Sequence, residues 1–384
     1  HCRIDMAAGT VVGASAEVAT HALLLVGVER QIPGLPVPDM LRRETAEQFI
    51  AQTHENYKRQ RGKDFGTTVP FMFCDEPMLL NSEAGLPCSR YLMREFRRDH
   101  GYDLSGEALL NLCFERPDSP PVRFDFWHTV NRLYTHNFLR TLHDWCARNK
   151  LLFTGHLIEH EWPSPKLTPN NMAGLRWMQA PGEDLLGFQF EPTTLDANGI
   201  YLLNLKELAS VVNQLGRQWS MVETCGGRGY HTAYAYFKSC EDFTLAFGVN
   251  VIDPHLAHQS LAGMGKYDWP QTLSDHSPWW AYYRTHADHV ARVNTALSQG
   301  REHNRVLVLM PTTSAWMHYT GSGFDAVNGH PSGARLAAIR ESQIALITTL
   351  YTHQVDFDLG DEYILAECGA VAGKRLRVGR RAYD

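Results

Sequence analysis

The sequence lacks the motifs of several common protein classes. No two cysteines form a Cys-x-x-Cys pair, which argues against a zinc ribbon and a thioredoxin-like site. Neither a G-x-G-x-x-G run nor a P-loop occurs, so phosphate-binding loops of those kinds are not indicated. The longest apolar run near the start, 21–28, is too short for a membrane span. The net charge of −6 gives no basic surface, so we expect neither nucleic acid nor an anionic membrane as a partner.

The composition is that of a globular protein with many ring-bearing side chains. Of its 384 residues, 44% are hydrophobic and 20% charged, which suffices for one large domain and part of another. Nine Trp, 15 Tyr and 19 His supply flat and hydrogen-bonding surfaces, which serve sugar-binding clefts and ordinary cores alike. The eight cysteines are scattered singly, and we interpret Cys74 and Cys225, each near an acidic residue, as packing residues.

Five short apolar segments alternate with amphipathic helices from residue 45 onward. This alternation predicts a parallel sheet with helices outside it. An acidic residue or a histidine follows each predicted strand, which favours an α/β fold of the (β/α)₈ TIM-barrel type with its chemistry at the carboxyl ends of the strands. An open, doubly wound sheet is the alternative, although a glycine-rich phosphate loop would then be expected. The predicted strands are 69–74, 151–155, 184–190, 218–222 and 248–252.

The strand and helix pattern restarts near residue 305, after a long predicted helix and a charged, glycine-containing link at 298–304. We expect residues 45–300 to form a catalytic (β/α)₈ barrel and 1–44 to be an irregular segment that belongs to it. Residues 305–384 are expected to begin a second α/β domain. Because the sequence opens on His1 and ends in a turn, we expect both ends to be truncated.

Two acidic residues at the end of segment 69–77 are candidate catalytic groups. Asp75 and Glu76 follow a strand-like apolar run, and Glu223 follows another such run three β/α units later. Glycoside hydrolysis needs two carboxyl groups that face each other across the sugar. We therefore predict that Glu76 and Glu223 form this pair from opposite sides of the barrel mouth. Asp75 would bind a sugar hydroxyl or alter the pKa of its neighbour.

A dense polar group follows the second predicted strand, with His156, Glu159, His160 and Glu161 close together in sequence. It could recognise hydroxyl groups or bind a metal, or it could be a solvated loop. Glu191 follows the next predicted strand in a similar way. Glu159 and Glu191 are candidate ligands for Ca²⁺, although their spacing is not that of an EF-hand.

Several aromatic residues and histidines are further candidates for substrate binding. Trp162, Trp177 and Tyr230 could stack on sugar rings, although packing is the more common role for each such ring. His255 and His258 are spaced i, i+3 and could bind metal from one helix, or make ordinary polar contacts. The full set of predicted substrate-binding residues is Asp75, His156, Glu159, Trp162, Trp177, Tyr230 and His255.

Four short motifs, taken in their order, resemble a known group of enzymes. They are Phe-Cys-Asp-Glu-Pro at 73–77, Phe-Thr-Gly-His at 153–156, Met-Val-Glu-Thr-Cys-Gly-Gly at 221–227, and Gly-Val-Asn-Val-Ile at 248–252 with a later Gly-Met-Gly-Lys. The region 45–300 resembles TIM-barrel glycoside hydrolases of the α-L-rhamnosidase family, glycoside hydrolase family 106. The order of the four motifs is also similar to that in clan-A enzymes such as the family 42 β-galactosidases.

The resemblance implies roles for particular residues. Glu76 would be the general acid at the end of the fourth strand, and Glu223 the base or nucleophile at the end of the seventh. On this numbering the first three barrel strands are missing, because they would lie wholly or largely before His1. A calcium ion at the sugar site would give Glu159 or Glu191 a role as its ligand. Clan-A enzymes usually have Asn where this chain has Asp75, a departure that leaves the stereochemical course open. The restart near residue 305 resembles the amidotransferase-like domain that follows the barrel in β-galactosidases of that kind.

We therefore expect a glycosidase, most closely α-L-rhamnosidase-like, that needs no cofactor for its chemistry and acts on a carbohydrate, with Ca²⁺ as an optional ion. The alternatives are a β-galactosidase-like or other clan-A enzyme, and a carbohydrate-binding barrel without activity. A third class is a metal-dependent hydrolase built on His156, His160, His255 and Glu191. The sequence leaves the linkage, the oligomeric state and the compartment undetermined, with an exported location favoured.

Overall fold

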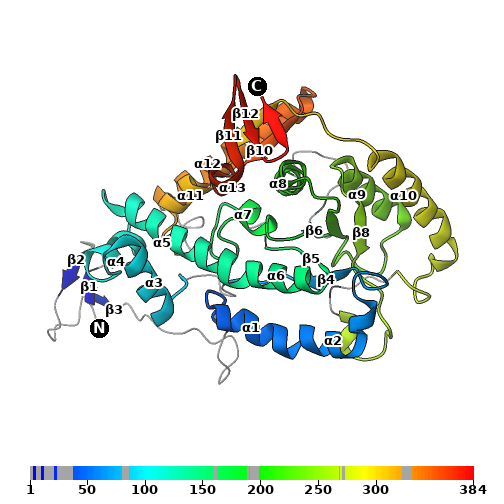
Figure 1. Ribbon diagram of the computed structural model, residues 1–384, viewed down its shortest axis with the longest axis horizontal. Helices are drawn as coiled ribbons and strands as arrows, with labels where there is room; N and C mark the ends of the chain where they lie inside the picture. Colours follow the sequence, from blue (N-terminus) through cyan, green and yellow to red (C-terminus); the bar gives the residue numbers. More distant parts are fainter. Residues whose placement is uncertain are drawn as a thin grey trace.

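The computed structural model describes residues 3–5, 10–12, 21–23, 38–79, 86–158, 162–187, 190, 199–267, 269, 273–321 and 331–384 (Figure 1). At its centre lies a five-stranded sheet whose order in space, β4-β5-β6-β7-β8, follows the order along the chain. All neighbouring strands run parallel. The strands are β4 (Phe71–Cys74), β5 (Leu152–Gly155), β6 (Ala180–Leu185), β7 (Met221–Thr224) and β8 (Val251–Pro254).

This sheet is a curled half-barrel, and each strand joins its neighbour through a helical crossover. The predicted parallel sheet with outer helices is thus confirmed. All five strands point the same way, so their carboxyl ends meet at one edge. That edge is where a barrel of this kind carries its functional residues.

Several predicted strand boundaries are wrong, among them that of β7, which covers Met221–Thr224 rather than 218–222. Strand β6 covers Ala180–Leu185 rather than 184–190, and β8 begins at Val251 rather than at residue 248. The start of β6 carries small residues because its backbone packs closely on β5, and a Cβ atom on Gly182 would lie 2.6 Å from the Gly155 carbonyl oxygen. Gly248 has a left-handed φ of 81° and belongs to the turn before β8. Neither feature gives the apolar run by which strands are recognised.

Helices in the first part of the chain pack on the outer side of the sheet (Figure 1). The first helical stretch is interrupted at Thr53, and the long helical stretch before β5 passes through a π-helical turn, Tyr134–Leu139. Pro residues near its start are compatible with a first helical turn. The helices are α1 (Arg43–Gln52), α2 (His54–Arg61), α3 (Arg90–His100), α4 (Glu107–Cys113), α5 (Ser119–Leu133) and α6 (Arg140–Arg148).

The following helices complete the cover of the half-barrel. They are α7 (Asn171–Leu175), α8 (Gly199–Leu215), α9 (Tyr234–Ala246) and α10 (Tyr283–Leu297). Helix α8 is buried along most of its length, because it packs between β6 and the C-terminal part of the chain. Among the described residues, no helix combines the length and the apolar character that crossing a bilayer requires.

The C-terminal part again alternates strands and helices. Its elements are β9 (Val306–Leu309), α11 (Thr312–His318), α12 (Pro331–Thr352), β10 (Phe357–Gly360), α13 (Glu362–Cys368), β11 (Gly369–Ala372), β12 (Arg375–Val378) and β13 (Arg381–Tyr383). Strands β9 and β10 pair in parallel, whereas β11, β12 and β13 form an antiparallel sheet. The hydrophobic core continues from the half-barrel into this part.

The segment 1–44, expected to be irregular, contains three short strands. Strands β1 (Arg3–Asp5), β2 (Thr10–Val12) and β3 (His21–Leu23) form an antiparallel sheet in the order β2-β1-β3. In Figure 1 this sheet lies at the opposite end of the molecule from α10. It is therefore not an element of the half-barrel wall.

Candidate active site

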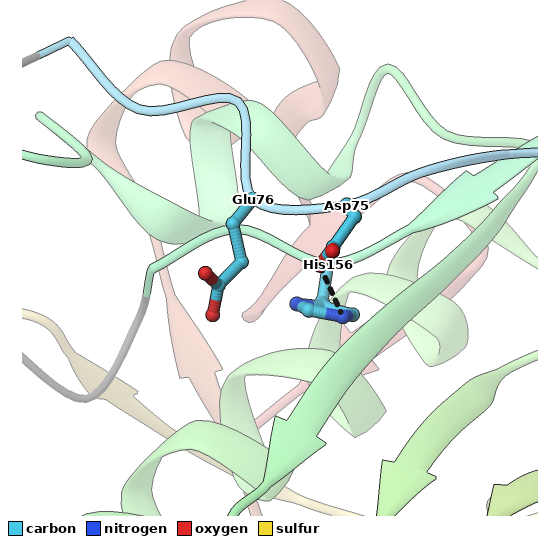
Figure 2. Close-up of side chains that lie close together, drawn as sticks. All are labelled: Asp75, Glu76 and His156. Atoms are coloured by element: carbon cyan, nitrogen blue, oxygen red, sulfur yellow. Dashed lines mark ion pairs between the residues drawn. The ribbon is translucent and has the colours of Figure 1, made fainter. Parts of the chain in front are cut away.

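The chain turns sharply where β4 ends, at the carboxyl edge of the sheet. Glu76 has a left-handed φ of 41°, which redirects the backbone directly after Asp75. The hydroxyl of the fully buried Tyr134 donates a hydrogen bond to the Pro77 carbonyl. This contact anchors the turn to the long helix, and the turn holds Asp75 and Glu76 beside the end of β5 (Figure 2).

His156, the first residue after β5, is the centre of the site. Its side chain is only 1% exposed, and its Nε2 atom lies 2.9 Å from Glu223 Oε2 and 3.3 Å from Asp75 Oδ1. The ring of Phe73 packs edge-on against it, with 5.6 Å between the centroids. Figure 2 shows the Asp75 side chain pointing to this ring, with the Glu76 side chain extending from the same turn to one side of it. One imidazole thus connects the end of β4 with β7.

Glu223 lies within β7 rather than after it, one residue before the end of the strand. In the sheet it is level with Asp184 of β6 and with Asp253 of β8. Side chains at the same level of neighbouring strands point to the same face, so three carboxylates form a row. His255 Nε2 lies 3.8 Å from Glu223 Oε1. Each oxygen of Glu223 therefore faces one histidine.

The row points to the inner face of the half-barrel, as the neighbouring residue of β6 shows. The Asn171 side-chain amide, at the start of α7, donates to Glu183 Oε1 at 2.8 Å and to Glu207 Oε2 of α8 at 2.9 Å. Glu183 therefore points outward to the helices. Since successive side chains of a strand alternate between faces, Asp184 points inward.

Asp253 differs chemically from its neighbours in the row. Its pKa is raised above the ordinary value, first by partial removal of the carboxyl group from water and then by the negative charge of Glu223. Sequence analysis missed Asp184 and Asp253 as site residues, because both predicted strands were displaced. Alternation of inner and outer residues along the correct strands would have identified them.

The structure brings together only some of the predicted site residues. Asp75, Glu76, His156, Glu223 and His255 converge at the carboxyl edge. Glu159, His160, Glu161 and Glu191 lie outside the described residues, so the structure does not place them.

The predicted ring residues occupy different surroundings. Trp162 is buried, and its ring is not an exposed stacking surface. Trp177 lies before β6, away from the carboxyl edge, with the guanidinium groups of Arg140 and Arg176 within 5.2 and 4.8 Å of its ring. Tyr230 is exposed in the segment after β7.

The expectation that His255 and His258 share a helix is wrong. Both lie in the irregular segment after β8, where the chain leaves the sheet without forming a helix. His255 faces Glu223, whereas the ring of His258 packs against Tyr230 with 6.0 Å between centroids. The two histidines therefore serve different contacts.

Among the described residues, one group of side chains could offer ligands to a metal ion. Asp75, Glu76 and His156 bring one possible ligand atom each within 4.8 Å of one another. Calcium prefers six to eight oxygen ligands, whereas this group offers two carboxylates and an imidazole. The imidazole Nε2 is in addition already engaged by Glu223. This group does not fit calcium, and the predicted ligands Glu159 and Glu191 lie outside the described residues.

Two cysteines near the site are suited to packing. Cys74 ends β4, and burial raises the pKa of its thiol to about 12. Burial also raises the pKa of Cys225, which follows β7. Both thiols therefore stay protonated and are poor nucleophiles at neutral pH.

The fold is similar to that of solved glycoside hydrolases. A rhamnosidase from Novosphingobium sp. PP1Y superimposes with a TM-score of 0.62 at 18% identity, covering 90% of this chain and 31% of the other. A β-galactosidase from the haloarchaeon Halorubrum lacusprofundi gives 0.55 at 12% identity, covering 82% of this chain and 50% of the other. A β-galactosidase from Rahnella sp. R3 gives 0.54 at 12% identity, covering 84% and 49%.

These likenesses concern the fold alone, because the identities are low. The chain spans between about a third and a half of the length of these enzymes. Its sequence matches no family profile and no curated protein. The three structural neighbours described above are nevertheless glycosidases, and the similarity of their folds to this chain extends over 82–90% of its length.

Proposed function

We propose that this chain carries the catalytic centre of a glycoside hydrolase, with Glu76 as the general acid and Glu223 as the base or nucleophile. The observation that supports this most directly is the position of His156. Its ring contacts Glu223 of β7, and one of its nitrogens lies within 4.8 Å of a carboxylate oxygen of Glu76, which follows β4. Two carboxyl groups from separate strands thus flank one point at the carboxyl edge, as glycosidic cleavage requires.

The roles follow from the surroundings of the two groups. Glu223 accepts a hydrogen bond from His156, and its other oxygen faces His255, so the carboxylate is held in one orientation. A fixed carboxylate suits attack on the anomeric carbon or on a water molecule. Glu76 sits on a turn that reaches over the edge and can approach the leaving oxygen. Asp75, also in contact with His156, supports the turn and can bind a sugar hydroxyl.

The substrate class that we propose first is an α-L-rhamnoside, with a β-galactoside as the alternative. The rhamnosidase neighbour has a higher TM-score than the two β-galactosidases and covers more of this chain. The motifs at 73–77 and 221–227 point the same way by resemblance.

The test is hydrolysis of 4-nitrophenyl α-L-rhamnoside and 4-nitrophenyl β-galactoside by the protein and its variants. Glu223→Gln should lower kcat by at least about 1,000-fold. Glu76→Gln should lose more with a poor leaving group than with nitrophenol, because an acid matters most for a basic leaving oxygen. Glu47→Gln, an exposed glutamate of α1, is the matched control. Equal turnover by Glu223→Gln and Glu47→Gln would overturn the proposal.

The same proteins and substrates distinguish the glycoside hydrolase from a carbohydrate-binding barrel without activity and from a metal-dependent hydrolase. A binding barrel would bind a glycan but release no nitrophenol with either substrate. A metal-dependent hydrolase would lose its activity in EDTA and recover it when one particular ion is restored. The anomer first released, followed by NMR, then shows whether configuration is retained or inverted.

A further inference from the structure

Large exposed apolar side chains differ in type before and after residue 282. Among the described residues up to 282, the large exposed ones are aromatic except for Met264. Beyond that point they are aliphatic. The aromatic ones are Tyr57, Phe73, Tyr230, Tyr267, Trp269, Trp279, Trp280 and Tyr282, and the aliphatic ones are Leu297, Val306, Leu309, Leu346, Val355 and Val371.

Most of the exposed rings lie in two connections of the half-barrel. Tyr230 lies between β7 and α9, and Tyr267, Trp280 and Tyr282 lie between β8 and α10. Connections that lead from a strand to the next helix lie at the carboxyl edge of the sheet. The rings therefore border the edge that holds Glu223 and His255. Loops at this edge are where binding residues usually occur.

Direct contacts join the two connections and hold some of the rings in place. The Tyr230 hydroxyl donates to the Lys266 carbonyl at 2.6 Å. The Lys266 ammonium lies 5.4 Å from the centroid of the Tyr267 ring. Trp280 stacks on Tyr283 with 4.9 Å between centroids and 19° between planes. Tyr267 and Tyr282 nevertheless remain 65% and 69% exposed, so much of their surface is open to a ligand.

We propose that Tyr230, Tyr267, Trp280 and Tyr282, here called the aromatic rim, bind sugar units of an oligosaccharide or polysaccharide beyond the unit that is cleaved. The inference rests on the proposed function, because it takes the bound chain to be the substrate. Flat rings complement the C–H faces of pyranose units, and neighbouring polar groups such as the Lys266 ammonium can bind hydroxyl groups. Rings that are already held lose little freedom on binding. Continuity with the site at the carboxyl edge favours a glycan over a protein partner.

Affinity electrophoresis of the full chain tests the rim without depending on turnover. The native gels contain soluble rhamnogalacturonan, pectic galactan or no polysaccharide. We expect at least one polysaccharide to retard the protein. Tyr267→Ala and Trp280→Ala should each weaken that retardation by up to about tenfold in dissociation constant. Tyr267→Phe should retain it. Tyr57→Ala, which removes a 59% exposed ring from α2, is the matched control and should run like the parent.

The outcomes separate the rim from the proposed function. Retardation that depends on the rim rings supports the aromatic rim, whether or not the protein hydrolyses a nitrophenyl glycoside. Absence of hydrolysis of both nitrophenyl glycosides would count against the proposed function alone. Hydrolysis together with retardation that the rim variants leave unchanged overturns the rim and leaves the proposed function standing. Absence of retardation by both polysaccharides also overturns the rim. Circular dichroism melts of each variant confirm that a loss of binding does not come from unfolding.

Discussion

The Nε2 atom of His156 lies 2.9 Å from Glu223 Oε2, although the two residues are 67 positions apart in the sequence. The contact joins β5 to β7 past the intervening β6. Because His156 is buried and Glu223 has little exposed surface, this pair fixes where the carboxylate points. The same nitrogen also approaches Asp75, so one ring orients groups from two sides of the site.

Replacing His156 by Ala should lower kcat/KM for the nitrophenyl glycoside by about 100-fold, because a misplaced catalytic carboxylate loses alignment. Added imidazole should restore part of the activity if the ring acts by orienting Glu223. His289→Ala is the control. It removes a histidine whose Nε2 lies 2.7 Å from Asp242 Oδ1, in a pair that is not part of the site. Equal activities for the two variants, each normalised to its folded fraction, would show that His156 has no positioning role.

Asp253→Asn should stabilise the protein at neutral pH. The pKa of Asp253 is raised above 3.8, so its ionised form is less favourable in the folded than in the unfolded chain. Below the unfolded pKa the neutral carboxyl therefore leaves the free energy of unfolding undiminished. As the pH rises through the raised folded pKa, ionisation of Asp253 lowers that free energy. We expect the Tm of Asp253→Asn to exceed that of the parent by roughly 1–2 °C at pH 7.

The difference should vanish below about pH 4, where the carboxyl is neutral in both states. Asp275→Asn, at an exposed position in the segment before α10, controls for the loss of one surface charge. Calorimetric scans of the three proteins from about pH 3 to pH 8 provide the measurement. A stabilisation independent of pH would contradict the assigned cause.

Gly155→Ala should destabilise the half-barrel strongly. Gly155 has a φ of 127°, and a Cβ atom there would lie 2.0 Å from the Cys74 carbonyl oxygen, where β4 and β5 pair. Since both the backbone conformation and the space exclude a side chain, we expect a loss above about 3 kcal/mol in the free energy of unfolding. Gly265→Ala, with no atom within 4 Å, should change it little. Urea titrations of both variants measure the difference, and similar midpoints would refute this account.

The regular part of the fold could be predicted from the sequence because its signals are local. The apolar runs that became β4, β5 and β7 and the amphipathic pattern of α5 and α6 needed no knowledge of distant contacts. The π-helical turn at Tyr134–Leu139 was not foreseen, since nothing in the local pattern distinguishes it from α-helix. The predicted position of β6 was wrong because the start of this strand carries small residues, which allow close backbone packing, instead of a run of large apolar residues.

The site was predictable only in part for a related reason. Glu76 and Glu223 are marked by strand ends, so they could be named. The level of Asp184, Glu223 and Asp253 in the sheet depends on the register between strands, which no single segment encodes. The central role of His156 likewise depends on two side chains, Asp75 and Glu223, that only the folded sheet brings to one ring.

The last prediction concerns the join between the half-barrel and the C-terminal part. Asp358 of β10 is fully buried and accepts hydrogen bonds from Asn213 of α8 at 3.0 Å, from Asn304 at 2.6 Å and from Tyr383 at 2.8 Å. Asp358→Ala would leave these donors buried without that acceptor, at a cost of about 3 kcal/mol. Because Asn213 belongs to the half-barrel, we expect the whole chain to unfold in one transition that shifts as a unit.

Chemical denaturation followed by tryptophan fluorescence and by far-UV circular dichroism tests this coupling, because coincident curves indicate a single transition. Asp356→Ala, at an exposed position just before β10, is the matched control and should leave the midpoint within experimental error. If Asp358→Ala instead separated the curves, or moved only an early transition, residues 305–384 would be an independently folding domain. A coincident shift of both probes would mean that α8 and β10 form one cooperative core, and that the strand restart near residue 305 marks no boundary in stability.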